Sequence, residues 1–318
     1  MTEYKRVLSI DGGGIKGVFP SAFLADIEKT LPEPIYSYFD LIVGTSTGGI
    51  IALGLALGLT ANEILDFYKL YGPKIFKGNA LFLTLKQAVW RKYSHEYLRS
   101  ALEKTFGDKL IGHAKTRAVV TSMNIDTGEV HLFKTAHHER FERDYKVSAV
   151  ETAMATASAP TFFPFYKTTS NFPLIDGGVW SNNPVGVAVT EALGVLDWSK
   201  DEIKILSLGC TEDLFDVSWR RKRNIGLLWA YTPKTAEVLM QGQSSGALGM
   251  ANTLLGHENV IRINEKVKKG RFRLDSAKDI DNLCALGENR ARNESGKNKQ
   301  VFFSEPASKF VPCQSVGI

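Results

Sequence analysis

Apolar runs and polar breaks alternate regularly over the first part of the chain. An apolar run over 7–10 predicts a short buried strand, and the pattern over 18–31 predicts a helix. A second strand is expected over 39–43 and a second helix over 47–57. Strands that alternate with helices in this order are typical of a parallel sheet covered by helices. The pattern therefore predicts an α/β fold.

Helix caps and turn residues divide the rest of the chain. Thr60 and Glu63 have the spacing of a capping box and predict a helix that ends near residues 71–73. Ser148 and Glu151 repeat that spacing. The other elements expected are helices over 94–106 and 152–158, paired strands over 117–125 and 129–135, a strand reaching 174–175, a helix opened by residues 182–184, a strand over 203–208, helical segments over 225–255 and an edge strand over 260–263. The polar tail beyond residue 293 predicts irregular structure.

The segment 74–93 predicts no regular element. It mixes apolar and basic positions and contains Phe76, Phe82 and Trp90. Both a lid over a site and an irregular surface connection fit this composition. If the protein is an enzyme whose activity must be restrained, this segment is the candidate for a gate that controls access to its site.

Composition indicates a globular protein with a large core. Of the 318 residues, 44% are hydrophobic and 23% are charged. Neither an internal repeat nor a linker-like segment divides the chain, so a single domain over 1–318 is expected. The net charge of +5 permits attraction to phosphate-bearing partners without requiring it, and no DNA partner is expected.

Cysteine usage and hydropathy favour a reducing, cytoplasmic location. The three cysteines have long spacings that match neither a zinc site nor a disulfide framework. The first residues lack the apolar region of a signal peptide. The longest apolar stretch, residues 50–59, is too short to cross a bilayer.

Three glycine-containing motifs stand at the edges of apolar stretches. They read Asp11-Gly12-Gly13-Gly14-Ile15-Lys16-Gly17, Gly44-Thr45-Ser46-Thr47-Gly48 and Asp176-Gly177-Gly178. In this order they supply the parts that acyl transfer needs: a nucleophile on a tight turn, a base, and backbone N–H groups for an oxyanion.

Ser46 is the candidate nucleophile. A predicted strand ends just before it and a predicted helix begins just after it, which is the context of a nucleophile elbow. Gly44 and Gly48 remove the side chains that would clash in so sharp a turn. The helix N-terminus also favours negative charge near the hydroxyl. A merely structural turn is the alternative.

Asp176 is the candidate base. It ends a predicted strand, and burial there would raise its pKa toward neutrality. An ordinary turn aspartate is the alternative. A triad in the order Ser, Asp, His would need a histidine after the acid, and only His257 follows Asp176. That conventional esterase remains a second hypothesis.

The glycine run is open to two interpretations. Consecutive glycines between a strand and a helix form a nest of N–H groups that can hold an oxyanion. The same residues satisfy G-x-G-x-x-G, which favours a nucleotide-binding regulator without catalysis. Against a dinucleotide site, Asp40 lies at the start of the second strand instead of following that strand.

These segments together resemble the patatin-like phospholipases. That family carries D-G-G-G-x-[RK]-G, G-x-S-x-G and D-G-[GA] in this order. Residues 155–164 and Asn182-Asn183-Pro184 add to the likeness. The resemblance covers about residues 5–210 and leaves a helical C-terminal part over about 211–318.

The resemblance implies a fold, a site and an activity. The fold would be a three-layer α/β/α sandwich with a mainly parallel sheet. Ser46 and Asp176 would form a catalytic dyad that hydrolyses acyl esters of membrane phospholipids without metal or cofactor. The oxyanion hole would comprise Gly12, Gly13 and Gly14, with Lys16 nearby. Lysine stands at position 16, where arginine is commoner in the family. The lysine keeps the positive charge but cannot form the bidentate hydrogen bonds of a guanidinium group.

The compact form of the chain also resembles bacterial patatin-like effectors of CBASS antiphage systems. Those effectors are switched on by a cyclic oligonucleotide and degrade the inner membrane. The implied partners are a phospholipid substrate, a cyclic oligonucleotide activator, the inner membrane as a peripheral contact, and a homo-oligomer on activation.

Two basic clusters, over 219–223 and 266–273, bear on that regulation. Their arginines and lysines can hold phosphates of a nucleotide or of anionic lipid headgroups. A solvated positive surface is the alternative. The candidate contacts are Arg220, Arg221, Arg223, Lys268 and Arg271.

Overall fold

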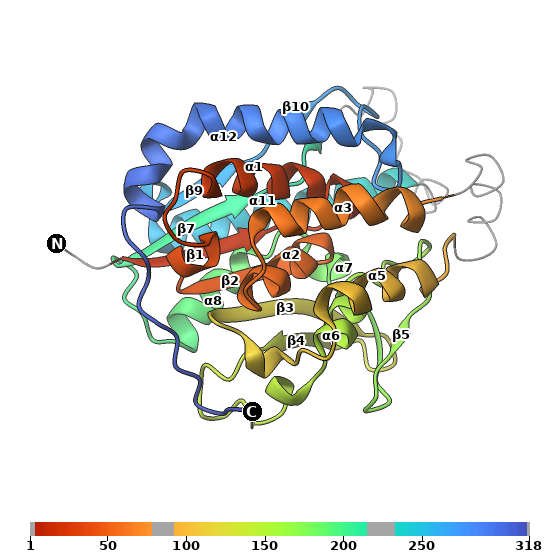
Figure 1. Cartoon of the computed structure of the whole chain (residues 1–318), viewed down its shortest axis with the longest axis horizontal. Helices are drawn as coiled ribbons and strands as arrows, with labels where there is room; N and C mark the ends of the chain where they lie inside the picture. Colours follow the sequence, from red (N-terminus) through yellow and green to blue (C-terminus); the bar gives the residue numbers. More distant parts are fainter. Residues whose placement is uncertain (1–3, 78–91, 215–232, 317–318) are drawn as a thin grey trace.

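A central sheet organises the protein (Figure 1). The computed structural model describes residues 4–77, 92–214 and 233–316. Within these ranges eight strands form one sheet, in the order β5-β6-β3-β2-β1-β7-β9 with β4 also paired to β3. Its strands are β1 (Lys5–Ile10), β2 (Leu41–Thr45), β3 (Arg117–Asn124), β4 (Val130–Lys134), β5 (Tyr166–Lys167), β6 (Pro173–Asp176), β7 (Ile203–Leu208) and β9 (Val260–Ile263). A separate parallel pair joins β8 (Glu212–Asp213) to β10 (Lys266–Val267).

The sheet is mainly parallel, as predicted. The neighbours β3, β2, β1, β7 and β9 all run in one direction. β4 and β6 run antiparallel to β3, and β5 runs antiparallel to β6. The carboxyl ends of the five parallel strands therefore meet at one edge of the sheet, where loops that follow them can form a site.

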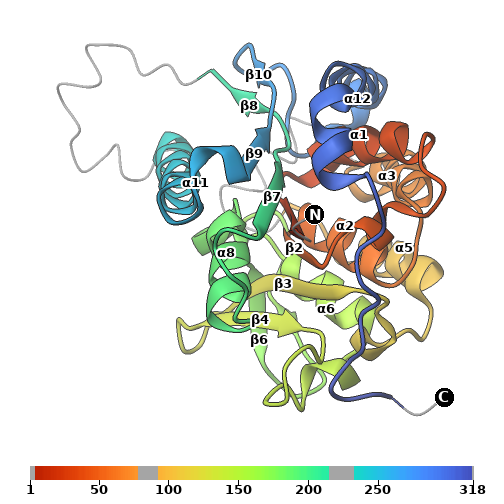
Figure 2. The same ribbon diagram turned by 90° about the vertical axis from the view of Figure 1, so that its left-hand side faces the viewer.

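Helices cover both faces and complete a three-layer α/β/α sandwich (Figure 2). One layer contains α1 (Val18–Glu28), α2 (Thr47–Ala56), α3 (Ala61–Ile75), α5 (Glu96–Phe106), α6 (Ala149–Thr156) and α12 (Ile280–Phe302). The other contains α8 (Val185–Gly194) and α11 (Pro233–Leu255), and the short α7 (Gly178–Ser181) links β6 to α8. Single 3-10 turns include η1 (Gly14–Gly17) and η5 (His257–Asn259). The predicted fold class is confirmed.

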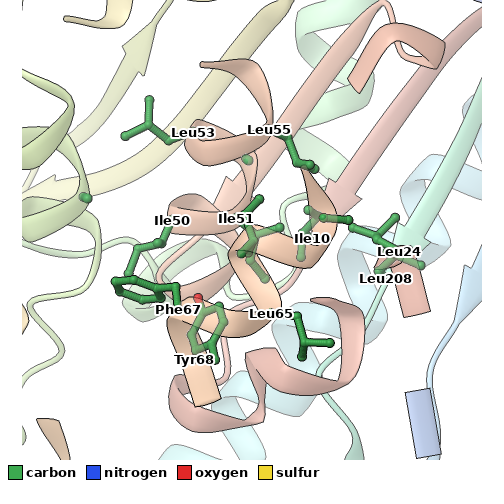
Figure 3. Close-up of a cluster of buried hydrophobic side chains, with 14 of the residues drawn as sticks. Ile10, Leu24, Ile50, Ile51, Leu53, Leu55, Leu65, Phe67, Tyr68 and Leu208 are labelled. Atoms are coloured by element: carbon green, nitrogen blue, oxygen red, sulfur yellow. The ribbon is translucent and has the colours of Figure 1, made fainter. Parts of the chain in front are cut away.

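α2 lies at the centre of the larger apolar core (Figure 3). All ten of its residues are buried. Ile51 packs in the same cluster as Ile10, Leu24 and Leu208, which come from β1, α1 and β7. A helix that is apolar all round is expected where protein surrounds it on every side. This packing gives the turn before α2 a rigid base.

Two helix boundaries differ from the prediction for local reasons. α3 runs through Pro73 to Ile75, because a proline in the last turn removes only one helical bond and the N–H of Phe76 still reaches the carbonyl of Gly72. α6 begins at Ala149. Ser148 caps it by accepting the Val150 N–H, while the Glu151 carboxylate accepts the N–H of Thr169 and closes no capping box.

The prediction of irregular structure beyond residue 293 is wrong for residues 294–302 and confirmed for residues 303–316. α12 continues to Phe302 and packs along α1. Leu283, Ala291 and Phe302 on this helix are buried, while most of its other positions are polar. A helix that contacts the core along one narrow stripe needs few apolar residues, so its composition resembles that of a loop.

Residues on either side of position 210 share the sheet and its apolar cores. β9 pairs with β7, and Ala251 and Leu255 of α11 join Val7 and Val43 in one cluster. None of the helices in the described ranges is both long and apolar enough to span a bilayer. The three cysteines, all within those ranges, are free thiols.

Candidate active site

Ser46 occupies a strained turn between β2 and α2. Its backbone has φ 56° and ψ −122°, a combination that costs free energy in any residue other than glycine. The N–H of Ser46 donates to Thr156 Oγ1 at 2.9 Å, and that hydroxyl donates to the carbonyl of Thr121 at 2.7 Å. The turn is therefore held by α6 and β3, with the Ser46 side chain half-buried. Thr156 is a supporting residue that the motifs alone did not single out.

Strand register brings Asp176 to the level of Ser46. Thr45 pairs with Thr121 across β2 and β3, and Ser122 pairs with Asp176 across β3 and β6. Because β4 pairs with Thr121 and Ser122 along the opposite edge of β3, β2 and β6 share one edge of β3, and Ser46, one residue beyond Thr45, lies next to Asp176. The two residues lie 130 positions apart in sequence, and the sheet brings them together.

Asp176 is buried, and its environment favours a base that titrates near neutrality. Burial raises the pKa of its carboxyl from 3.8 to about 6, although hydrogen bonds from the Ser46 hydroxyl and the Gly178 N–H oppose that rise. The Gly178 bond is 2.7 Å long. The N–H of Asp176 itself donates to the carbonyl of Ser158 at 3.1 Å. A buried carboxylate beside a hydroxyl can accept its proton.

The glycine loop passes directly beside Ser46. A Cβ placed on Gly12 would lie 3.2 Å from the Ser46 Cβ and 2.5 Å from Asn182 Oδ1. Only glycine allows the backbone so close to the hydroxyl. The N–H of Gly12 donates to the carbonyl of Asn182 at 2.9 Å, so this amide already has a partner. Gly12 therefore allows the loop backbone to approach Ser46 closely. The expectation that its N–H donates to an oxyanion is not met in this structure.

The N–H groups of Gly13 and Gly14 are candidate donors to an oxyanion. Among the described residues neither N–H has a hydrogen-bond acceptor. Gly14 has φ 56°, a left-handed conformation that glycine adopts without strain. Unpaired amides of this kind beside a nucleophile can stabilise negative charge that develops on a substrate oxygen.

Arg262 of β9 anchors the start of the glycine loop. Its guanidinium donates to both carboxylate oxygens of Asp11, with Nη1 to Oδ1 at 2.8 Å, and also to the Ser207 hydroxyl at 2.8 Å. Burial raises the pKa of Asp11, and Arg262 acts against that rise. Bidentate pairing of this geometry fixes orientation as well as charge. The sequence signal for it was a single arginine in an otherwise apolar strand.

Comparison with known proteins identifies the family. The model for patatin-like phospholipases matches residues 8–189, more than half of the chain. The chain belongs to the patatin-like phospholipase family. It is therefore a member of a family of serine acyl hydrolases.

Relatives match this chain over nearly its whole length. A cGAMP-activated phospholipase of Escherichia coli is 31% identical, covering 96% of this chain and 94% of the relative. A cGAMP-activated phospholipase of Vibrio cholerae serotype O1 is 29% identical over 96% of both chains. Patatin-T5 of Solanum tuberosum is 28% identical, covering 98% of this chain and 90% of the relative. The likeness extends well beyond the three motifs.

Lys16 of the family's glycine motif contacts the loop after β7. Its Nζ donates to the carbonyl of Thr211 at 3.1 Å. Burial lowers the pKa of this ammonium. Lys16 thus ties the glycine loop to the connection between β7 and β8. Its observed contact is structural, and a role beside an oxyanion stays a prediction.

His257 and His95 lie in different parts of the fold. His257 lies in η5, just before β9 begins, whereas Ser46 follows the carboxyl end of the parallel strand β2. The two residues therefore lie at opposite edges of the sheet, and the triad hypothesis with His257 is wrong. His95, at the start of α5, is the histidine near the site: its Nε2 lies 3.1 Å from the hydroxyl of Ser158, the residue whose carbonyl contacts Asp176.

The remaining predicted contacts lie partly outside the described residues. Arg220, Arg221 and Arg223 fall there, as do residues 78–91 of the candidate gate. Lys268 and Arg271 are exposed on the loop after β10. In the ranges that the structure describes, no group of three or more histidine, cysteine, aspartate or glutamate side chains could hold a metal ion.

Proposed function

We propose that this protein hydrolyses fatty-acyl esters of membrane phospholipids through a dyad of Ser46 and Asp176. The observation that carries the proposal is the buried Asp176 carboxyl, whose pKa the Ser46 hydroxyl influences, with the glycine loop alongside. Membership of the patatin-like phospholipase family supports the substrate class.

The chemistry follows from these groups. Asp176 accepts the hydroxyl proton as Ser46 Oγ attacks the ester carbonyl carbon, and the N–H groups of Gly13 and Gly14 hold the resulting oxyanion. Collapse of that intermediate breaks the bond to the alcohol, which takes the proton from Asp176. Water then attacks the acyl-serine, gives a proton to Asp176 and releases the fatty acid, after which the proton returns to Ser46.

The pH dependence of hydrolysis tests the base. Because burial raises the pKa of Asp176 to about 6, kcat/KM should rise as the pH passes through that value and level off above it. Initial rates of fatty-acid release between about pH 4.5 and pH 8.5 would measure this. A rate that falls across the same interval would contradict Asp176 as the base.

We also propose that a cyclic oligonucleotide such as cGAMP activates the enzyme in antiphage defence. Support comes from the two bacterial relatives described as cGAMP-activated phospholipases, which match 96% of the chain. The enzyme would reside in the cytoplasm, contact the inner membrane peripherally and form a homo-oligomer on activation. A nucleotide-binding regulator without catalysis and an unregulated esterase are the competing functions.

One assay separates these functions. The purified protein is added to phosphatidylethanolamine and phosphatidylglycerol vesicles, with and without a panel of cyclic oligonucleotides, and released fatty acid is measured. We expect almost no fatty-acid release from the protein alone and clear release when one member of the panel is present. Full fatty-acid release without nucleotide would support the hydrolase activity and contradict its regulation by a nucleotide. A regulator without catalysis would release nothing and would not react with a serine-directed fluorophosphonate under any condition.

Reversing the charge of Lys268 and Arg271 tests the basic loop. Because each cation near a phosphate contributes roughly 1 kcal/mol, K268E/R271E should weaken binding of the phosphate-bearing partner by about 30-fold or more, that is by about 2 kcal/mol or more. Fluorescent cGAMP titration and vesicle co-sedimentation distinguish nucleotide from lipid headgroup. K200E/K299E, with the same charge change at exposed positions, is the matched control. Unchanged binding in both assays would indicate a solvated surface.

A further inference from the structure

The second half of the glycine loop is seated on a distant segment of the chain. The carbonyl of Leu274 accepts the N–H of Ile15 at 2.9 Å. A Cβ placed on Gly14 would lie 2.3 Å from that same carbonyl oxygen. The segment 272–275, here named the strap, therefore touches the backbone that carries the unpaired amides. The strap thus contacts the glycine loop at Gly14 and Ile15.

A buried ion pair fastens the strap. The side chains of Asp275 and Lys92 are 7% and 3% exposed, and the ammonium donates to the carboxylate. The Tyr93 hydroxyl donates to the same oxygen at 3.1 Å, and Arg273 lies 3.5 Å from the other. Burial, and then the Asp275 charge, raise the pKa of Tyr93, which keeps the phenol protonated as a donor. The buried Asp275 carboxylate thus has three polar partners: Lys92, Tyr93 and Arg273. Removing one of them would leave a buried charge without full compensation and would reduce stability.

The donors to Asp275 are themselves tied to the other half of the site. The N–H groups of Lys92 and Tyr93 donate to the carbonyls of Thr161 and Phe162 at 3.0 and 2.8 Å. These carbonyls lie three and four residues after Ser158, whose carbonyl accepts the Asp176 N–H. A continuous set of contacts therefore joins the segment beside Asp176 to the glycine loop.

We propose that Asp275 is a positioning residue for the reaction, holding the strap so that the Gly13 and Gly14 amides are aimed at the developing oxyanion. The inference rests on the proposed function. Charge on the substrate oxygen grows only toward the transition state, so misaligned donors lower kcat with little effect on KM.

The chain offers a matched control for a merely structural ion pair. Glu191 has a side chain that is 3% exposed and contacts Lys134 at 2.6 Å and His137 at 2.8 Å, joining α8 to the segment at β4. Neutralising it disturbs a buried pair of the same kind away from the strap. A general loss of stability would affect both variants alike, whereas loss of positioning would affect only the strap.

The experiment compares Asp275→Asn, Tyr93→Phe and Glu191→Gln in the full chain. We expect D275N to lower kcat by about 10- to 100-fold with KM within threefold, and Y93F by about threefold to tenfold, since one misplaced oxyanion donor typically costs about 10²–10³-fold. Hydrogen exchange of residues 11–17 should quicken in both. E191Q should leave kcat and this exchange unchanged.

Folded D275N with kcat within threefold of the wild type, or with unaltered loop exchange, would overturn the proposal. Should D275N fail to fold, Y93F decides, and wild-type kcat and exchange in that variant would overturn it equally. A wild-type protein that neither releases fatty acid nor reacts with fluorophosphonate would instead refute the proposed function. In that case the loop exchange still tests the strap.

Discussion

Ser46→Ala should abolish fatty-acid release, lowering kcat by at least about 10⁴-fold. Without the hydroxyl no acyl-serine can form. Asp176 then has no hydroxyl proton to accept, and no oxyanion forms for the loop amides to stabilise. Release from phospholipid vesicles in the presence of the activating nucleotide measures the effect. Labelling by fluorophosphonate should disappear in the same variant.

The fold should survive this substitution, because Ser46 makes its supporting contacts through the backbone N–H to Thr156. Ser21→Ala is the matched control: it removes a buried hydroxyl of α1 that makes no hydrogen bond to any described residue. We expect wild-type release from S21A. Hydrolysis by S46A above about 1% of the wild-type rate would exclude Ser46 as the nucleophile.

Asp176→Asn should remove activity and at the same time stabilise the protein at neutral pH. Loss of the base should lower kcat by about 10²- to 10⁴-fold. The pKa of about 6 exceeds the ordinary value of 3.8, so the folded protein binds this proton more tightly than the unfolded chain. The stability from this group is full below the unfolded value and is lost as the pH rises through about 6. At about pH 8 the ionised carboxyl therefore costs about 3 kcal/mol, which asparagine relieves.

Urea unfolding at two pH values measures this effect. D176N should exceed the wild type in free energy of unfolding by up to about 3 kcal/mol near pH 8 and by little near pH 4. Asp126→Asn, in the exposed turn after β3, is the control and should show no such pH-dependent difference. A D176N protein less stable than the wild type near pH 8 would show that the carboxylate is better solvated than its burial indicates.

Local features explain why much of the site was predictable. The turn at Ser46 depends on five consecutive residues and on the apolar runs that flank them, so strand, elbow and helix are visible in order. Asp176 likewise ends a recognisable strand. The same reasoning assigned Gly12 a donor role, and the structure shows that its N–H is bonded to Asn182. Which amide is unpaired depends on a residue 170 positions away.

The supports of the site were not predictable in this way. Arg262 meets Asp11 across 251 positions, and Lys92 meets Asp275 across 183. Neither pair belongs to a periodic pattern, so no local signal shows that Asp11 meets Arg262 or that Lys92 meets Asp275. The last turns of α12, beyond residue 293, were missed because a helix packed along one stripe is mostly polar.

By itself, the amino-acid order determined the alternation of strands and helices, the elbow at Ser46 and the identity of the candidate acid, because these follow from backbone preferences and side-chain spacing over a few residues. Tertiary structure alone decided that Ser46 and Asp176 lie next to each other along one edge of β3, that Gly13 and Gly14 keep unpaired amides, and that the strap fixes them. Those outcomes depend on strand register and on burial of charges from distant segments, which no local pattern encodes.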